Sequence, residues 1–308
     1  MILIIYTPCT FRNQVYLIKE FQECIKRDSG GNSMDRMELN ELVHRLFCEV
    51  EGNHVTVERE DGTVKKLQMF SEPLIGIGSA KDPLFQEYKD PKAVGPWHRS
   101  PKEWLPKART VISLFFPAGE EARKSNRTEP ETPSLEWLYC RIEGNEFLRA
   151  FIARLRDSLR EEGYPSCAPA LEEGFQAFMN QKPDSDSEEP VYGSMWSERH
   201  IAYLCGLGTF GLSKGIITRK GMAGRFCSLV TSLELETDVR PYQGLYDYCI
   251  RCGECIRRCP VHAISEEGKE HAPCHQWLQH VKKEYAPRLG CGKCQTAVPC
   301  ESGIPRRG

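Results

Sequence analysis

Four cysteines within residues 248–264, the stretch YCIRCGECIRRCPVHAI, have the spacing of iron-sulfur ligands. They follow the pattern C-x2-C-x2-C-x3-C-P, which is formed by Cys249, Cys252, Cys255, Cys259 and Pro260. In this bacterial [4Fe-4S] pattern, three thiolates on a tight loop bind one cluster and the fourth thiolate binds a second cluster. The pattern therefore predicts two clusters and requires four more cysteine ligands nearby.

The four additional cysteines lie in the part of the chain that follows. The ligands that we predict for one cluster are Cys249, Cys252, Cys255 and Cys300. The ligands that we predict for the other cluster are Cys259, Cys274, Cys291 and Cys294. A pair of zinc sites is the alternative, because C-x2-C pairs also bind zinc. The third cysteine of the run and the proline after the fourth favour iron-sulfur clusters.

Seven further cysteines show no ligand spacing, and we expect most of them to be buried and unreactive. They are Cys9, Cys24, Cys48, Cys140, Cys167, Cys205 and Cys227. Disulfides would require an oxidising compartment. The sequence shows neither a secretory signal nor an apolar run of transmembrane length. We therefore expect a cytoplasmic protein whose thiols are reduced or bound to metal.

The composition is that of a globular protein of one large domain or two modest ones. The chain has 308 residues, of which 40% are hydrophobic and 27% charged, and its formal net charge is -2. This charge gives no basic surplus for nucleic acid, although a local basic patch can be hidden in a neutral total. We expect no DNA partner and no membrane partner.

The elements that must position the cysteines begin with a helix over residues 37–50, where apolar side chains share one helical face. HVTVERE and TVKKLQM, separated by Asp61-Gly62, predict a β-hairpin with a type I′ turn. TVISLFF, residues 110–116, predicts a buried strand. Residues 71–108 and 119–134 are interpreted as ordered loops.

The strongest helical pattern is FLRAFIARLRDSLREEG, residues 147–163, with one apolar face and Gly163 as its stop. Residues 182–190 are an acidic stretch that predicts a surface loop. SERHIAYLCGLGTFG predicts a helix that runs into a glycine-rich turn, and GIIT and FCSLVTSLEL predict strands. The predicted fold class is α+β.

Three segments are expected from these patterns. Residues 1–36 are a leader that differs from the rest, and we suspect that translation starts at Met34 or Met37. Residues 37–240 form the core domain, and residues 241–308 form a ferredoxin-like module with two [4Fe-4S] clusters.

From Thr110 to Pro305 the chain resembles epoxyqueuosine reductase and its relatives, iron-sulfur proteins that share a core with corrinoid reductive dehalogenases. The resemblance rests on ARTVISLFF, APALEE, the helix FLRAFIARLRDSLREEGY, ERHIAYLCGLGTFGLSKGIIT and the eight-cysteine tail with CGKCQ. The block GLGTFG follows a helical stretch, so it is not a dinucleotide-binding loop, which would follow a strand.

This resemblance implies a nitroreductase-like α/β core with a cobalamin held between the core and the two clusters. It implies that the clusters relay electrons to cobalt and that cobalt carries the chemistry. It also implies a set of residues along the corrinoid, where glycines let the backbone approach a flat ring. These residues are Gly206, Leu207, Gly208, Thr209, Phe210, Gly211, Arg225 and Ser228.

The chain departs from the resemblance at the proton donor. Epoxyqueuosine reductases have an aspartate in an Asp-Ser-Ala-Pro stretch, and this chain has Ser166-Cys167-Ala168-Pro169 instead. Epoxide reduction needs an acid near the leaving oxygen. The candidates for this role are Tyr139, Glu172, Glu173, Tyr192 and His200, and each is equally explained as an ordinary packed or solvated side chain.

We therefore expect a corrinoid-dependent reductase related to epoxyqueuosine reductase but distinct in function. The sequence ends at Gly308 without the helical-repeat extension of tRNA-binding relatives, so we expect a small-molecule substrate rather than tRNA. An external ferredoxin or flavodoxin is the expected electron donor. The alternatives are a non-catalytic electron-transfer protein that docks a partner enzyme and a flavin enzyme.

Overall fold

The computed structural model describes residues 33–306 except 60 and 183–190. It divides the chain into two units, Met1–Asp35 and Arg36–Gly308. Most of the predicted leader and nearly all of the predicted acidic loop thus lie outside the described residues. The suspected start at Met34 or Met37 and the boundary at residues 240 and 241 remain predictions.

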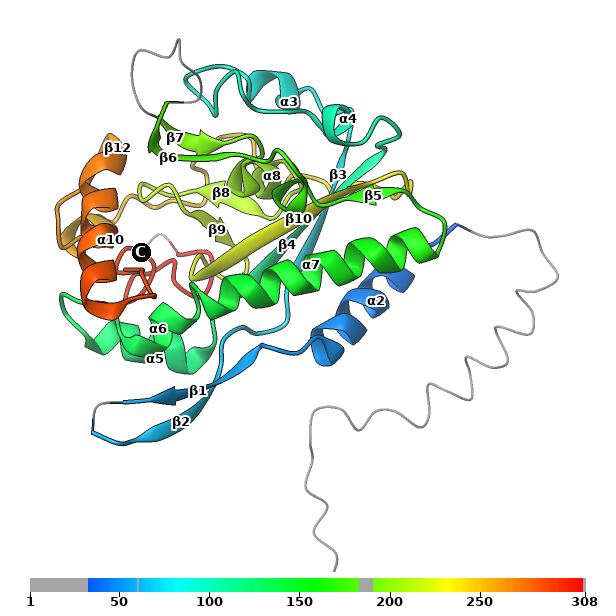
Figure 1. The fold of residues 1–308 in the computed structure, drawn as a ribbon. Coiled ribbons are helices and arrows are strands. Elements are labelled where there is room, and N and C mark those ends of the chain that lie inside the picture. The colour runs from blue at the N-terminus through cyan, green and yellow to red at the C-terminus, as the bar shows by residue number, and fades with distance from the viewer. Residues whose placement is uncertain (1–32, 60, 183–190, 307–308) are drawn as a thin grey trace, which may run out of the picture. The chain divides into compact units, whose positions relative to one another are not determined.

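A four-stranded antiparallel sheet forms the centre of the second unit (Figure 1). Its strand order is β3 (Leu74–Ser79), β4 (Thr110–Pro117), β10 (Gly224–Thr231) and β5 (Ser166–Cys167). Every residue of β4 is buried, as its mostly apolar sequence predicts for a strand covered on both faces. The strand predicted at TVISLFF is therefore confirmed.

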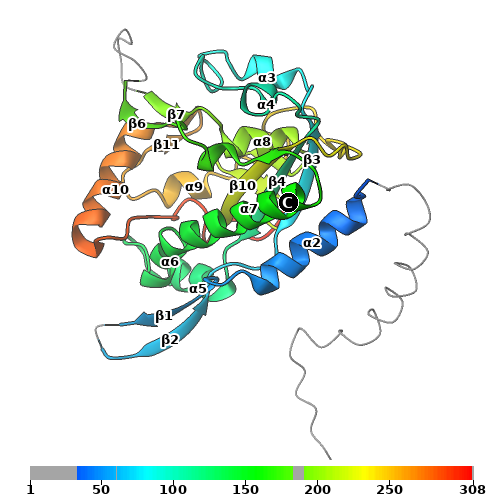
Figure 2. The same ribbon diagram turned by 45° about the vertical axis from the view of Figure 1, so that its right-hand side comes forward.

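Helices cover both faces of this sheet. On one face, Phe116 of β4 meets Phe151 of α7 (Glu143–Glu161) at 5.0 Å between ring centroids. The helix α2 (Arg36–Glu49) lies beside α7 in both views (Figures 1 and 2). On the other face, Val111 packs with Ile201 and Leu204 of α8 (Glu198–Leu204). All three helices were predicted at these positions.

Strand β3 was interpreted as loop because its sequence, LIGIGS, contains two glycines, which are rare in strands. The structure explains both glycines by the close approach of α8. A Cβ at Gly76 would lie 2.5 Å from the carbonyl oxygen of Cys205, and one at Gly78 would lie 2.5 Å from Leu204 Cδ2. The glycines therefore allow α8 to pack on this edge of the sheet.

The two segments interpreted as loops contain short helices as well. Residues 71–108 include α3 (Leu84–Glu87) and α4 (Pro101–Trp104). Residues 119–134 include α5 (Glu120–Thr128), which is followed by α6 (Leu135–Tyr139). Helix α5 has little apolar sequence and buries only Ala122 and Asn126, so it has no stripe of large apolar side chains from which a helix could be predicted.

Three hairpins complete the core. The predicted hairpin is confirmed as β1 (His54–Glu58) and β2 (Val64–Gln68), but its loop spans residues 59–63 and is wider than a two-residue type I′ turn. The second joins β6 (Ala177–Gln181) to β7 (Val191–Ser194). The third joins β8 (Gly208–Phe210) to β9 (Ile216–Thr218).

The described part of the predicted module, residues 241–306, is called the cluster segment below. It contains four short or medium elements: α9 (Glu254–Arg257), β11 (Ile264–Ser265), β12 (Gly268–Lys269) and α10 (His271–Tyr285). The rest is irregular, which agrees with the predicted cluster-binding loops.

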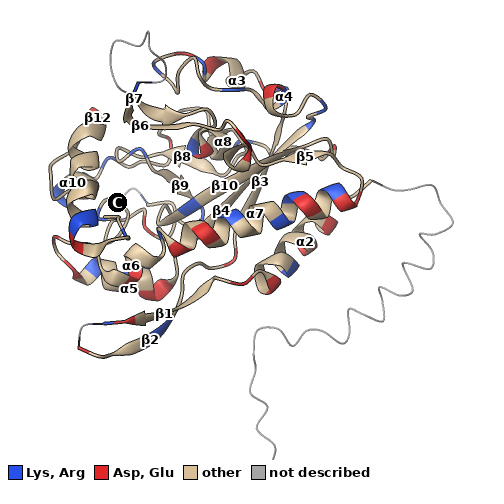
Figure 3. Ribbon diagram, viewed as in Figure 1, with Lys and Arg blue, Asp and Glu red and all other residues tan. Residues whose placement is uncertain are grey.

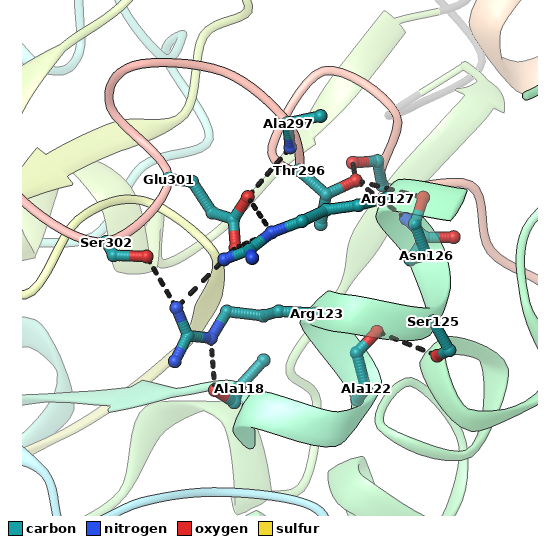
Figure 4. Close-up of polar contacts among 11 residues, drawn as sticks. Ala118, Ala122, Arg123, Ser125, Asn126, Arg127, Thr296, Ala297, Glu301 and Ser302 are labelled. Carbon is teal, nitrogen blue, oxygen red and sulfur yellow. Dashed lines mark hydrogen bonds and ion pairs between the residues drawn. The ribbon is translucent and has the colours of Figure 1, made fainter. Parts of the chain in front are cut away.

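Helix α5 anchors the end of the cluster segment to the core (Figure 4). The Nε atom of Arg127 donates to both carboxylate oxygens of Glu301 at 2.9 Å, and Ala297 N donates to Glu301 Oε2 at 2.7 Å. Glu301 is buried, so this bidentate pairing satisfies a charge that would be costly alone.

The mixture of helices and strands confirms the predicted α+β class at this level. Lys and Arg alternate with Asp and Glu along α7, whereas the central strands are almost without charge (Figure 3). Over the described residues, no helix is both long and apolar enough to cross a membrane.

Candidate functional site

The structure brings the first predicted ligand set together in one small pocket. Cys249, Cys252, Cys255 and Cys300 line it, together with Met222 of the core. Met222 N donates to the carbonyl oxygen of Cys300 at 2.9 Å, which fixes this distant cysteine beside the other three. Burial raises the pKa of Cys300 to about 12 and that of Cys255 to about 11, and neighbouring thiols add to both effects.

The second predicted ligand set lines a different and much larger cavity. The four residues are Cys259, Cys274, Cys291 and Cys294. Burial raises the pKa of Cys291 to about 12 and also raises that of Cys294, and Cys274 contributes to both shifts. Gly292 has a φ of 72° and packs so tightly on Trp137 that a Cβ would lie 2.1 Å from Trp137 Cε2.

These two groups fit metal clusters by the chemistry of their donors. Neutral buried thiols with raised pKa values gain little from being together, whereas binding a metal removes their protons and repays their burial. None of the thirteen cysteines among the described residues forms a disulfide. In that same part of the chain, no three His, Cys, Asp or Glu side chains converge as ligands of a single metal ion. The cluster assignment itself remains a prediction.

The large cavity has a volume of about 1030 Å³, which is at the upper end of the range for cofactor sites. One wall comes from the core and includes Trp196, Tyr203 and Phe210. The opposite wall comes from the cluster segment and includes Trp277 and the second cysteine group. The cavity therefore lies between the core and the predicted clusters.

Only two of the eight residues predicted along a corrinoid, Phe210 and Arg225, line this cavity. The structure accounts for the glycines of GLGTFG by protein contacts instead. A Cβ at Gly208 would lie 2.0 Å from the carbonyl oxygen of Ile217, because β8 and β9 pair closely there. Gly206 has a φ of 78° at the end of α8.

The other four predicted corrinoid residues are not among the residues that line the cavity. They are Leu207, Thr209, Gly211 and Ser228. Thr209 Oγ1 accepts from Tyr248 N at 2.9 Å, which ties β8 to the cluster segment. The prediction that these residues contact a cofactor stays a prediction.

Some of the predicted proton-donor candidates line the large cavity and others do not. Tyr192 and His200 line the cavity, whereas Tyr139, Glu172 and Glu173 do not. Tyr192 stacks on His271 of α10 at 5.3 Å between ring centroids. His200 Nδ1 lies 2.8 Å from Ser197 Oγ, and burial lowers the pKa of His200 to about 3, so its ring is neutral at pH 7.

The excluded candidates are engaged elsewhere. Tyr139 lies under the guanidinium of Arg288, 3.8 Å from its ring centroid. Glu172 lies 4.0 Å from Arg156. Ser166, which replaces the aspartate of the resembled family, is buried in β5, and its hydroxyl donates to Thr231 Oγ1 at 2.8 Å.

Glu198 is an acid of the cavity that the sequence analysis missed. Its Oε2 accepts from Ser228 Oγ at 2.6 Å, and Trp196 Nε1 donates to the same hydroxyl at 2.8 Å. Burial raises the pKa of Glu198 to about 7, although the bond from Ser228 lowers it. The only sequence signal was its place as the first residue of the predicted helix that precedes GLGTFG, which does not distinguish it from an ordinary acid of a first helical turn.

One comparison with known proteins concerns the cysteine run of the cluster segment. The family described as "4Fe-4S binding domain" matches residues 245–265. The chain therefore carries an iron-sulfur domain at the place where the cysteine run predicted it.

Curated relatives place the chain beside a particular group of proteins. It is 29% identical over 143 residues to the epoxyqueuosine reductase of Bacillus anthracis, which covers 42% of this chain and 36% of that protein. It is 28% identical over 124 residues to that of Leadbetterella byssophila, covering 37% and 38%. The predicted resemblance to epoxyqueuosine reductases is confirmed, but the match spans little more than a third of these relatives.

The solved structures that resemble this chain are less similar to it in sequence than the curated relatives. Epoxyqueuosine reductase from Streptococcus thermophilus matches 88% of this chain and 67% of its own at 17% identity, with a TM-score of 0.48. A catabolic reductive dehalogenase matches 87% of this chain and 37% of its own at 13% identity, with a TM-score of 0.46.

Proposed function

We propose that this protein is a corrinoid-dependent oxidoreductase with two [4Fe-4S] clusters on a nitroreductase-like core, related to epoxyqueuosine reductase. The observation that carries the proposal is that the second cysteine group and the aromatic wall of the core line one cavity of about 1030 Å³. This arrangement would set a redox centre directly beside a cofactor-sized space.

The clusters would carry electrons, one at a time, from the protein surface to the cavity. Cys252 of the first group is exposed, whereas the second group opens into the cavity. The two groups adjoin, because Cys294 contributes to the raised pKa of Cys255. An external ferredoxin or flavodoxin would dock near Cys252 and deliver electrons there.

A corrinoid in the cavity would supply the strongly reducing centre that acts on the substrate. The chain's own residues would do the rest. Phe210 and Trp196 line the cavity and would contribute apolar surface beside a flat ring. Burial raises the pKa of Glu198 to about 7, so this acid can carry a proton at neutral pH. It would act as the proton donor in place of the aspartate that this chain lacks.

A cobalamin titration of the anaerobically purified, cluster-reconstituted protein tests the proposal. We expect a saturable change in the cobalt absorption and EPR spectra at about one corrinoid per chain. Ala177 lines the cavity, so Ala177→Trp should narrow it and weaken binding at least about tenfold. Ala150 is exposed on α7 outside the cavity, so Ala150→Trp is the matched control.

Intact clusters without any corrinoid response would instead support the non-catalytic electron-transfer protein. A yellow chromophore that survives removal of iron would support the flavin alternative. Iron content tests the cluster assignment separately. Cys252→Ser should lose about half of the iron, whereas Cys227→Ser, which changes a buried thiol of β10, should keep it. Equal losses in the two variants would contradict the assignment.

A further inference from the structure

The wall of the large cavity is strongly basic, although the chain as a whole is nearly neutral. Its acidic residues are Glu87 and Glu198. Its lysines and arginines are Lys92, Arg141, Arg199, Lys214, Arg225, Lys269 and Lys293. Against a formal net charge of -2 for the whole chain, this is a local concentration of positive charge.

Three of these cations lie close to one another and come from separate parts of the chain. Arg141 follows α6, Arg199 belongs to α8, and Arg225 belongs to β10. Burial, together with the charges of Arg141 and Arg199, lowers the pKa of Arg225 to about 9. Arg199 also lowers the pKa of Arg141. The fold therefore holds three like charges together on the wall of one cavity.

No carboxylate compensates these three charges within residues 33–306, apart from the gaps at 60 and 183–190. Arg225 Nε donates to the neutral amide oxygen of Asn145 at 3.0 Å. The ion pairs of the described residues include neither Arg141, Arg199 nor Arg225. Glu198 accepts from Ser228 rather than from an arginine. Unpaired charges in such places are costly and usually mark a ligand site.

Thiolates of a bound cluster would balance two of the arginines but not the third. Cys274 is near both Arg141 and Arg199, and Cys294 is near Arg199. The only cysteine that affects Arg225 is Cys140, whose pKa burial raises to about 12, so that it stays a neutral thiol. Arg225 would thus keep an unbalanced charge even in the cluster-loaded protein.

We propose that Arg225, with Arg141 and Arg199, binds the carboxylate or phosphate group of a small-molecule substrate in this cavity. Guanidinium groups bind such anions through two parallel hydrogen bonds, and three of them on different elements would fix both position and orientation. The inference rests on the proposed function, since it names the class of substrate for the same cavity. It predicts an anionic compound small enough to share the cavity with a cofactor.

Isothermal titration of the anaerobic, cluster-loaded protein with inorganic phosphate tests this directly. We expect saturable binding that Arg225→Gln weakens about tenfold or more, as for the loss of a charge-assisted hydrogen bond. Arg154 is exposed on α7 and pairs with Glu161, so Arg154→Gln is the matched control and should bind phosphate like the wild type. Iron content, measured on every sample, shows that the clusters are retained.

Phosphate binding that is absent from the wild type, or equal in Arg225→Gln and the wild type, would overturn the inference. A corrinoid can also present a phosphodiester, so each variant is titrated with cobalamin and with cobinamide, which lacks that group. Weaker binding of cobalamin alone would assign the arginines to the cofactor and overturn the substrate assignment. Arginine-dependent phosphate binding without any corrinoid binding would keep the anion site and reject the proposed cofactor.

Discussion

In the central sheet every residue of β4 is buried, whereas α10, the longest element of the cluster segment, buries only Val281. The core is stabilised by apolar contacts such as the cluster of Phe116, Phe147 and Phe151. The cluster segment has only small apolar clusters around its cysteines and is joined to α5 by polar anchors. The difference teaches where to expect a dependence on metal: the core should be ordered by burial alone, and the cluster segment by its bound clusters.

Removal of iron should separate the two regions most sharply. With chelator and reductant, residues 241–306 should be cleaved by protease about tenfold faster or more, because the segment loses the bonds that order it. The core should stay protected. Mass spectrometry of the fragments locates the cuts. Equal protection of the segment before and after removal of iron would contradict the comparison.

Phe151→Ala should test the core side. Phe151 is fully buried against Phe116, so its loss should lower the free energy of unfolding by about 3–5 kcal/mol. Denaturant unfolding followed by circular dichroism measures the change, with iron content as the control. Iron loss from the folded variant would show that the two regions are not independent.

Glu198→Gln should change how stability depends on pH. Burial raises the pKa of Glu198 from its ordinary value of 4.5 to about 7 in the folded protein. Between these two pH values the folded state therefore keeps a proton that the unfolded state releases. Wild-type stability should therefore fall as pH rises from 4.5 through 7, and stay low above it. In the variant, which cannot titrate at this position, the free energy of unfolding should fall by about 1–3 kcal/mol less over this range, allowing for partial solvation of Glu198. Urea unfolding of the wild type and of Glu198→Gln at pH 5.5 and 8 measures this difference. The same pH dependence in both proteins would contradict the raised pKa of Glu198.

Arg127→Leu should have the smallest effect, about 1 kcal/mol on unfolding, because Arg123 lies 3.5 Å from Glu301 and still compensates its charge. The change should appear mainly as faster proteolysis of the cluster segment. Arg154→Leu, which breaks an exposed pair on α7, is the control and should change stability by less than about 0.5 kcal/mol. A loss of stability in Arg154→Leu as large as that in Arg127→Leu would show that the contact of Arg127 with Glu301 is no more important than an ordinary surface ion pair.

The sequence predicted those features that depend on local pattern. The cysteine run, helix α7 and strand β4 follow from spacing and apolar periodicity. The four cysteines of each predicted set line one pocket, and their assignment to clusters stays a prediction. Strand β3 was missed because Gly76 and Gly78 serve packing against α8 rather than strand propensity. Helix α5 was missed because its buried face is only Ala122 and Asn126.

The cavity wall could not be predicted, because it is assembled from distant parts of the chain. Arg141, Arg199 and Arg225 are separated in sequence and look like ordinary surface residues there. Their proximity depends on the packing of α6, α8 and β10 around one space. Glu198 was missed for the same reason, since its burial comes from tertiary contacts and not from its neighbours in sequence.

The contact between Gly292 and Trp137 gives the protein an internal optical probe. Gly292 lies between two predicted ligands, and its backbone touches the indole ring of a tryptophan in the core. An iron-sulfur chromophore assembled on Cys291 and Cys294 would quench the emission of that indole by energy transfer. Trp277 lies beside the same cysteines, so the tryptophan emission of the purified protein would fall as the metal is loaded, without any added label.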